Sequence, residues 1–209
     1  CYHLTTERVK VEQNTQKFSF KELISEIAHN KALIGIIVCA LLFLLAQLSL
    51  SNMNNYIYPN YFGNVSAMSL ANLAGMVVIL VLSTFIVKLS AKVGKKELSV
   101  IGSIISAAAF LILFFIHTDN VWVWIVLVLI SSVGTAMFNM VIWAMITDVI
   151  DDSEVRTGVR QDGTIYSVYS FARKLGQACS SGISGVLLSI IGYTAATAHD
   201  PKVVDGIYN

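Results

Sequence analysis

The chain has 209 residues, of which 56% are hydrophobic and only 13% are charged, and its formal net charge is +1. A typical soluble domain carries about 25% charged residues, so the composition argues against a soluble protein. The small net charge gives no reason to expect a nucleic-acid partner.

The charges are clustered, and no charged side chain occurs between Lys31 and Lys88. A membrane-spanning helix needs about 20 apolar residues, so this interval can hold two crossings with a turn between them. We therefore expect an all-α integral membrane protein.

Residues 1–30 precede the first apolar run and form a polar segment that ends in a short helix. Ser19 and Glu22 have the spacing of a capping box. Four apolar side chains then fall on one helical face, namely Phe20, Leu23, Ile24 and Ile27. The pattern fits an amphipathic helix at the membrane surface or against the bundle, and it fits an ordinary connector equally well.

Five apolar segments of helical length follow and form one bundle over residues 31–192. The predicted crossings are residues 31–56, 66–88, 98–117, 121–148 and 164–192. Pro59 and Gly63 predict a turn after the first crossing, and Gly94 predicts one after the second. Residues 193–209 are polar and are expected on the opposite side of the membrane from the N-terminal segment.

The positions of Lys and Arg predict the orientation of the bundle. With five crossings, nearly all of them fall on the N-terminal side, at Arg8, Lys10, Lys17, Lys21, Lys31, Lys88, Lys92, Lys95, Lys96, Arg156 and Arg160. Lys202 falls on the other side, and Arg173 and Lys174 fall inside the membrane. We therefore expect the N-terminal side to be cytoplasmic.

The fifth predicted crossing carries a polar stripe at helical spacing. Its members are Tyr166, Ser170, Arg173, Lys174, Gln177, Ser181 and Ser184. A cation at the bilayer centre costs about 2.5–3.5 kcal/mol on insertion scales, and Lys174 lies roughly 15 Å into the helix. The pair therefore faces a wet cavity with a polar ligand, or it pairs with a carboxylate on a neighbouring helix. The other predicted crossings contain no acidic residue within their apolar runs.

Small residues continue along the same helix. The spacings Ala178-x-x-x-Gly182 and Ser181-x-x-x-Gly185 are typical of close helix approach in membranes. We expect them to pack against a neighbouring helix.

An acidic cluster marks the end of the fourth crossing, at Asp148, Asp151, Asp152 and Glu154. Three interpretations stay open: a solvated helix end, a metal site, or an ionic lock with Arg160 or with groups outside this chain. Nothing in the spacing requires a metal, and the three cysteines match no zinc or redox motif. We therefore expect no metal and no cofactor.

The stretch TDVIDDSEVRTGVRQDGTIYSVYSFARKLGQA, over residues 147–178, resembles the sugar–cation symporters of the glycoside–pentoside–hexuronide family, which have the major facilitator fold. The similarity is ungapped and specific from Asp148 to Gly176. TTERV near the start and KKE after Gly94 resemble loops of the same family. The resemblance implies that the chain is the C-terminal half of such a protein, with family helices seven to eleven, and that a last helix follows Asn209.

The resemblance also implies site residues. The family's sugar-site lysine falls on Lys174, its neighbouring polar positions on Tyr169 and Ser170, and a helix-ten position at the sugar on Asn139. The adjacent Arg173 occurs in some members, where an Arg–Lys pair suits a uronate carboxylate. The polar stripe adds two further candidate substrate contacts, Tyr166 and Gln177. The family's cytoplasmic gate falls on Asp148, Asp151, Glu154 and Arg160.

The implied function is cation-coupled sugar symport by alternating access in a bacterial plasma membrane. The partners are a glycoside, pentoside or hexuronide, the lipid bilayer and the N-terminal half, which is expected to bind the coupling Na⁺ or H⁺. A truncated, non-transporting interaction or sensor module is the alternative. An intramembrane enzyme is disfavoured, because His117 stands alone at a loop and no nucleophile–base set lies at membrane depth.

Overall fold

The computed structural model describes residues 30–158, 160, 162–194 and 196–208, and its regular elements there are all helical. They are α2 (Lys31–Tyr56), the π-helical turn η2 (Ile57–Tyr61), α3 (Val65–Val93), α4 (Lys95–Ile116), α5 (Val121–Thr157), α6 (Asp162–Ile190) and α7 (Pro201–Tyr208). The expected amphipathic helix before α2 lies outside the described residues, except for Asn30.

Asparagine side chains begin three of the long helices. Asn30 Oδ1 accepts a hydrogen bond from the backbone N–H of Leu33 at 3.0 Å, and Asn64 does the same for Ala67 at 3.0 Å. At the start of α5, Asn120 Oδ1 accepts a hydrogen bond from the backbone N–H of Trp122 at 2.9 Å. Each cap satisfies a backbone donor that has no partner within the first helical turn.

Every predicted crossing is a helix in the structure. Four of them, α2 with η2, α3, α4 and α5, are long and apolar enough to cross a membrane. Helix α6 has 29 residues, as many as α3, but it does not reach the same hydropathy because polar side chains occupy one of its faces. Because it packs along α2, we treat it as the fifth crossing.

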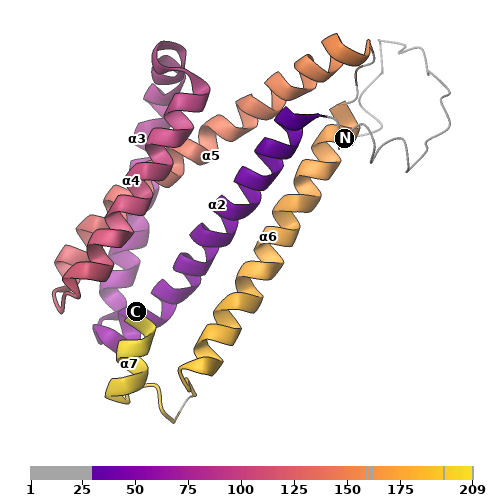
Figure 1. Ribbon diagram of the computed structural model, residues 1–209. Coiled ribbons are helices and arrows are strands. Elements are labelled where there is room, and N and C mark those ends of the chain that lie inside the picture. The colour runs from indigo at the N-terminus through magenta and orange to yellow at the C-terminus, as the bar shows by residue number, and fades with distance from the viewer. Residues whose placement is uncertain (1–29, 159, 161, 195, 209) are drawn as a thin grey trace, which may run out of the picture.

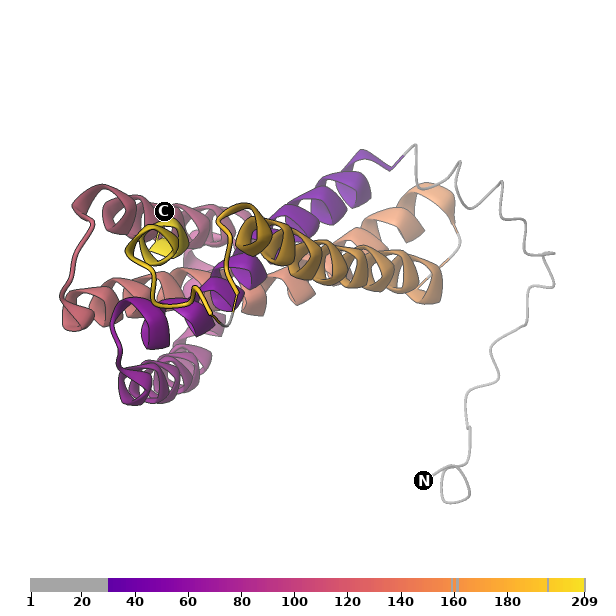
Figure 2. The ribbon, with the colours of Figure 1, turned by 90° about the horizontal axis from the view of Figure 1, so that it is seen from below.

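The helices form two packed groups joined by α5. Helices α3 and α4 pack against the first part of α5, and α6 packs against α2 (Figure 1). Figure 2, a view from below, shows the same pairing of α2 with α6. The start of α2, the turn between α3 and α4 and the end of α5 lie at one end of the bundle, where the sequence predicted a cytoplasmic face.

The apolar core is divided along the length of α5. One cluster joins α2, α5 and α6 at the end where α5 finishes, and it includes Phe138, Ile142 and Tyr169. A second cluster joins η2, α3, α4, α5 and α7 at the opposite end, and it includes Trp124 and Tyr208. The region between the two clusters contains polar side chains, as described below.

Helix α5 is longer than predicted. The expected crossing ends at residue 148, whereas the helix continues to Thr157 and stops at Gly158, whose φ of 71° is left-handed. No glycine or proline occurs between Gly134 and Gly158 to end it earlier. The acidic cluster therefore lies on a regular helix rather than in a loop.

The end of the bundle that contains η2 and α7 also differs from the predicted turns and loops. Pro59 does not turn the chain but lies within η2, and the turn follows at Gly63, whose φ is 60°. A π-helical turn accommodates a proline because the usual backbone pairing is already interrupted. The segment predicted as polar contains α7, which Tyr208 fixes to the end of α4 by donating to the carbonyl of Leu113 at 2.9 Å.

Helices α4 and α5 approach each other closely at a pair of glycines. A Cβ added at Gly102 would lie 2.6 Å from the carbonyl oxygen of Gly134, and a Cβ at Gly134 would collide with the carbonyl of Gly102. The expected contact through Gly182 and Gly185 is wrong for this part of the chain, since nothing described lies within 4 Å of a Cβ at either. The close approach is instead made where two glycines from different helices meet.

Gly134→Ala is therefore expected to destabilise the bundle. Alanine normally stabilises a helix interior by about 1 kcal/mol relative to glycine, but here the added methyl group meets backbone and costs about 1–3 kcal/mol. Thermal unfolding in detergent should show a lower midpoint. Gly182→Ala is the matched control and should leave the midpoint unchanged or raise it. Equal midpoints for both variants would contradict the close contact.

Candidate functional site

Helix α6 has three faces, which follow from its contacts. Ala172 and Gly176 are buried against α2, and Ser180 on the same face hydrogen bonds to Ser49 at 3.1 Å. Phe171 and Val186 are 70% and 59% exposed on the far side, as expected of a lipid-facing surface. The polar stripe lies between these two faces.

The structure separates the two adjacent cations. Consecutive helical residues point about 100° apart, so Arg173 turns toward α5 while Lys174 turns away from it. The Arg173 guanidinium lies 4.9 Å from the ring centre of Trp143 and 5.8 Å from that of Tyr169. These cation–π contacts stabilise a charge that water does not fully solvate.

Lys174 is exposed in this chain, and its Nζ donates to Gln177 Oε1 at 3.1 Å. Ser170 is half-buried on the same stripe, and the ring of Tyr166 lies 5.8 Å from that of Trp143. Neither Arg173 nor Lys174 lines any of the cavities described below.

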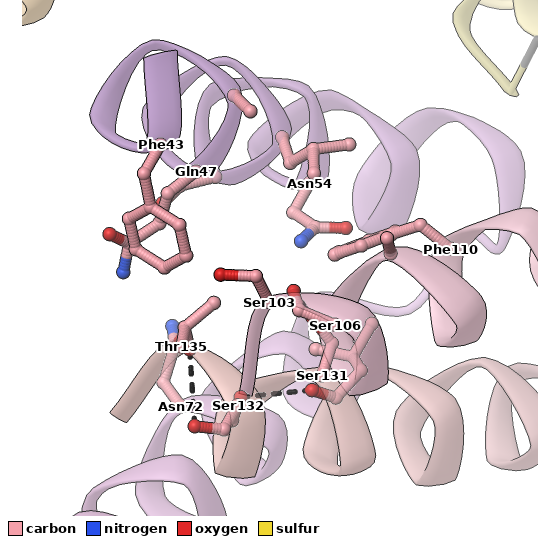
Figure 3. Close-up of a pocket in the computed structure, with 15 residues that line it drawn as sticks. Phe43, Gln47, Asn54, Asn72, Ser103, Ser106, Phe110, Ser131, Ser132 and Thr135 are labelled. Carbon is pink, nitrogen blue, oxygen red and sulfur yellow. Dashed lines mark hydrogen bonds between the residues drawn. The ribbon is translucent and has the colours of Figure 1, made fainter. Parts of the chain in front are cut away.

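A polar cavity of about 330 Å³ lies between α2, α3, α4 and α5, at the break between the two apolar clusters (Figure 3). Figure 3 shows Asn54 of α2 pointing into the space next to Ser103 and Ser106 of α4, whereas the amide of Gln47 lies beside Phe43. The lining residues are Phe43, Ala46, Gln47, Leu50, Ser51, Asn54, Asn72, Ser103, Ser106, Ala107, Phe110, Val128, Ser131, Ser132 and Thr135. None of them is charged.

A second polar cavity of about 310 Å³ adjoins the first. The two share Gln47, Asn72 and Thr135, so they are parts of one polar region. A larger space of about 610 Å³ lies between α2, α4, α6 and α7, but leucine, isoleucine and aromatic side chains dominate its walls. A hydroxyl-rich ligand needs hydrogen-bond partners, so the polar region is the better candidate site.

Asn139 connects the polar cavity with the cationic part of α6. Its Nδ2 donates to Gln47 Oε1 at 3.2 Å and to the carbonyl oxygen of Thr135 at 2.9 Å. Gln47 and Thr135 both line the cavity, and Trp143 lies one helical turn further along α5. Asn139 is thus the predicted residue that the structure brings nearest to the cavity.

The residues that line the cavity are not among the site residues predicted from the sequence, because that prediction depended on charged residues within the crossings. The sequence does contain a pattern that indicates a polar cavity, namely amide and hydroxyl side chains inside apolar helices. Examples are Gln47, Asn72 and the pair Ser131–Ser132. Their grouping depends on four helices, so only the structure reveals that they face one space.

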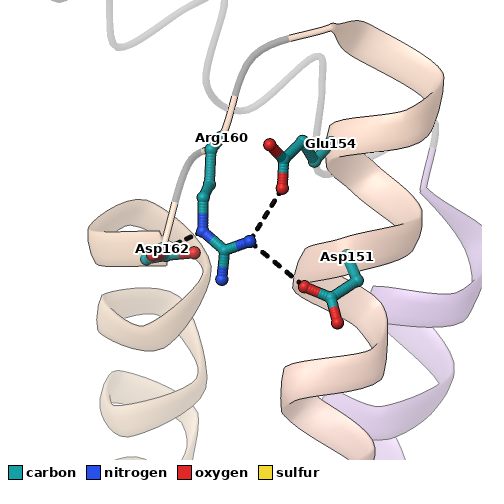
Figure 4. Close-up of polar contacts among 4 residues, drawn as sticks. All are labelled: Asp151, Glu154, Arg160 and Asp162. Carbon is teal, nitrogen blue, oxygen red and sulfur yellow. Dashed lines mark hydrogen bonds and ion pairs between the residues drawn. The ribbon is translucent and has the colours of Figure 1, made fainter.

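At the other end of α5, the acidic cluster forms ion pairs (Figure 4). Arg160 Nη1 lies 3.2 Å from Asp151 and 2.8 Å from Glu154 on α5, and its Nε lies 2.9 Å from Asp162 on α6. The hydrogen bonds to Asp162 and Glu154 raise the pKa of Arg160 above its already high ordinary value. The guanidinium therefore stays charged and joins the end of α5 to the start of α6.

Asp148 has a different partner from the other residues of the predicted gate. Its two carboxylate oxygens accept from Lys95 Nζ at 2.6 and 2.7 Å, which connects α5 with the start of α4. The sequence placed Lys95 only among the cytoplasmic charges, and it missed Asp162. Among the described residues, no group of three or more His, Cys, Asp or Glu side chains is arranged to hold a metal ion.

These features describe a multi-pass membrane protein, a helical bundle with a polar region between two apolar clusters and ion pairs at one end. The sequence family described as "MFS/sugar transport protein" matches residues 1–209, and the chain belongs to this family of sugar symporters. The resemblance drawn from residues 147–178 is therefore confirmed.

Individual relatives agree with that family. The chain is 32% identical to the "Uncharacterized symporter YjmB" of Bacillus subtilis (strain 168) over 99% of the chain and 45% of the relative. It is 35% identical to the "Glucuronide carrier protein homolog" of Escherichia coli (strain K12) over 56% of the chain and 26% of the relative.

The "Isoprimeverose transporter" of Lactiplantibacillus pentosus is 24% identical over 97% of the chain and 42% of the relative. The chain thus spans a little under half the length of the relatives that it matches from end to end.

Arg160→Gln is expected to loosen the junction of α5 and α6 while changing overall stability little, because exposed ion pairs contribute little to folding. In the full-length protein, hydrogen–deuterium exchange should become several-fold faster at the end of α5 and the start of α6. Arg156→Gln is the matched control, since Arg156 pairs with Asp152 on its own helix at 3.0 Å. Equal exchange in the two variants would contradict a cross-helix role for Arg160.

Proposed function

We propose that this chain forms the C-terminal half of a cation-coupled sugar transporter that works by alternating access. The observation that carries the proposal is the presence of two cations near the middle of α6, of which Arg173 is half-buried beside α5 and Lys174 is exposed. Among the described residues, neither cation forms an ion pair with a carboxylate. A substrate that enters a wet cavity beside them is then the natural counter-charge.

The preferred substrate class is a sugar acid or its glycoside. A guanidinium and an ammonium together bind a carboxylate through charge-assisted hydrogen bonds, and such bonds are stronger than neutral ones. Trp143 beside Arg173 is 41% exposed and offers an aromatic face on which a sugar ring can lie, whereas Tyr169 is buried in the apolar core. The name of the glucuronide carrier homolog agrees with this class.

The missing half of the translocation path is expected to come from an N-terminal bundle. Lys174 and the exposed polar stripe would then face the cavity between the two halves rather than lipid. The coupling Na⁺ or H⁺ would bind to carboxylates of that N-terminal bundle. We propose a bacterial plasma membrane as the location and a cytoplasmic position for Arg160 and its ion pairs; the distribution of Lys and Arg supports this orientation.

The ion pairs of Arg160 and Lys95 are proposed to act as a cytoplasmic gate. They are exposed pairs that join α5 to α6 and to α4, so they can exchange partners at small cost when the two halves rock. Asp148, Asp151 and Glu154 supply the carboxylates of this gate.

Arg173→Ala tests the substrate class in the full-length transporter. A hydrogen bond to a charged group contributes about 1.5–3 kcal/mol, which corresponds to roughly a ten- to hundredfold loss in uptake efficiency for a uronide. Uptake of a neutral glycoside should fall much less. Phe171→Ala, on the lipid-facing side of α6, is the control and should affect both substrates little. Equal losses for uronide and neutral glycoside in Arg173→Ala would count against an acidic substrate.

The chain by itself is expected not to carry out coupled uptake. Liposomes that contain only this polypeptide should accumulate no sugar in response to a Na⁺ or H⁺ gradient, whereas liposomes with the full-length protein should. Concentrative uptake by the isolated chain would overturn the proposal that coupling depends on an N-terminal half.

A further inference from the structure

The polar face of α5 continues from the cationic region into the uncharged cavity. Trp143, Asn139 and Thr135 are separated by four residues each, so they follow one another along one face of the helix. Arg173 lies over Trp143 at one end of this line, and the cavity begins at Thr135 at the other. Eight residues of helix span about 12 Å, which exceeds the length of a single sugar ring.

The cavity offers hydrogen-bond donors that the described part of the chain leaves unused. The side-chain amides of Asn54 and Asn72 make no hydrogen bond to any described residue. Gln47 uses its Oε1 to accept from Asn139, and its own N–H groups have no described partner. Asn54 and Gln47 are half-buried and Asn72 is exposed, so a ligand or water that enters the cavity can reach these amides and hydrogen bond to them.

The hydroxyl groups of the cavity supply acceptors. Ser103 donates to the carbonyl of Ser99 at 2.9 Å and Ser132 donates to that of Val128 at 2.9 Å. Thr135 donates in the same way to Ser132, at 3.1 Å. Each oxygen keeps a lone pair that can accept from a ligand. Sugar hydroxyls donate and accept at once, so amide donors next to hydroxyl acceptors suit them.

The cavity is also unsuited to a charged group. No charged side chain lines it, and a carboxylate placed there would lose its hydration without gaining a counter-charge. Phe110 adds an apolar surface for the C–H face of a ring. The volume of about 330 Å³ lies within the range of about 300–1,000 Å³ that holds small molecules.

We propose that this cavity is a second substrate subsite, which binds the neutral, hydroxyl-bearing ring of a two-ring glycoside whose acidic ring lies at Arg173. The inference rests on the proposed function and adds a selectivity for length. The cationic region selects the acid group, and the cavity favours two-ring glycosides over free sugar acids. Asn139, hydrogen bonded to Gln47, lies between the two subsites.

The test measures equilibrium binding to the full-length transporter in detergent, with two probes: free glucuronic acid and a disaccharide of glucuronic acid linked to glucose. Thr135→Val and Asn72→Leu remove cavity hydrogen bonds on two different helices. Each should weaken binding of the disaccharide about three- to tenfold and that of glucuronic acid less than twofold. Having two variants keeps the test valid if one of them fails to fold.

Thr84→Val is the matched control. Thr84 also donates to a carbonyl of its own helix, that of Val81 at 2.7 Å, but it is exposed and lies outside the cavity. It should leave binding of both probes unchanged. Equal weakening of both probes by the cavity variants, or no weakening of either, would overturn the subsite while leaving the transport function intact. A wild-type protein that binds neither probe would overturn both proposals.

Discussion

Hydrocarbon cannot hydrogen bond, and this one property of the membrane governs where polar side chains lie in the bundle. Backbone groups are satisfied within helices, and each polar side chain in a crossing has to find a protein partner, water or a ligand. Arg173 finds the faces of Trp143 and Tyr169, and Lys174 finds Gln177. None of these partners neutralises the charge of Arg173 or Lys174, so the two cations make the bundle less stable than apolar residues at the same positions would.

The same reasoning applies to the uncharged cavity. A bundle shaped only for stability would fill the space between α2, α3, α4 and α5 with apolar side chains. Here the apolar core is divided into clusters toward the two ends of α5, and the region between them contains amides and hydroxyls. Local violations of core packing are most often found at functional sites, which supports the proposal that the polar region and the cationic stripe both contact substrate.

The two ends of the bundle use different forces. At one end, α7 and η2 are held by buried aromatic rings, including Tyr58, Trp124 and Tyr208. At the other end, exposed ion pairs from Lys95 and Arg160 hold the ends of α4, α5 and α6. Buried aromatic packing is hard to rearrange, whereas exposed charges exchange partners with little change in free energy. The ion-paired end is therefore the better suited to opening and closing.

Much of the fold was predictable because it depends on local chemistry. The length and hydropathy of each apolar run indicated the helices, and Asn64 and Asn120 lie where the second and fourth begin. The family was recognisable from a continuous segment between Asp148 and Gly176. Two helix ends differ from the predicted bounds of the crossings: α5 continues past residue 148 to Thr157, and Pro59 lies inside a helical turn.

By itself, the sequence determined the class of protein, the apolar segments that form the long helices and the charged end of the bundle, because hydropathy and charge can be assessed for each segment separately. Only the tertiary structure decided that Arg173 faces α5 while Lys174 does not, and that Gly102 meets Gly134. It alone paired Lys95 with Asp148 and brought Gln47, Asn72 and Thr135 to one cavity. These outcomes depend on how helices distant in the chain rotate and pack against one another, which no local pattern encodes.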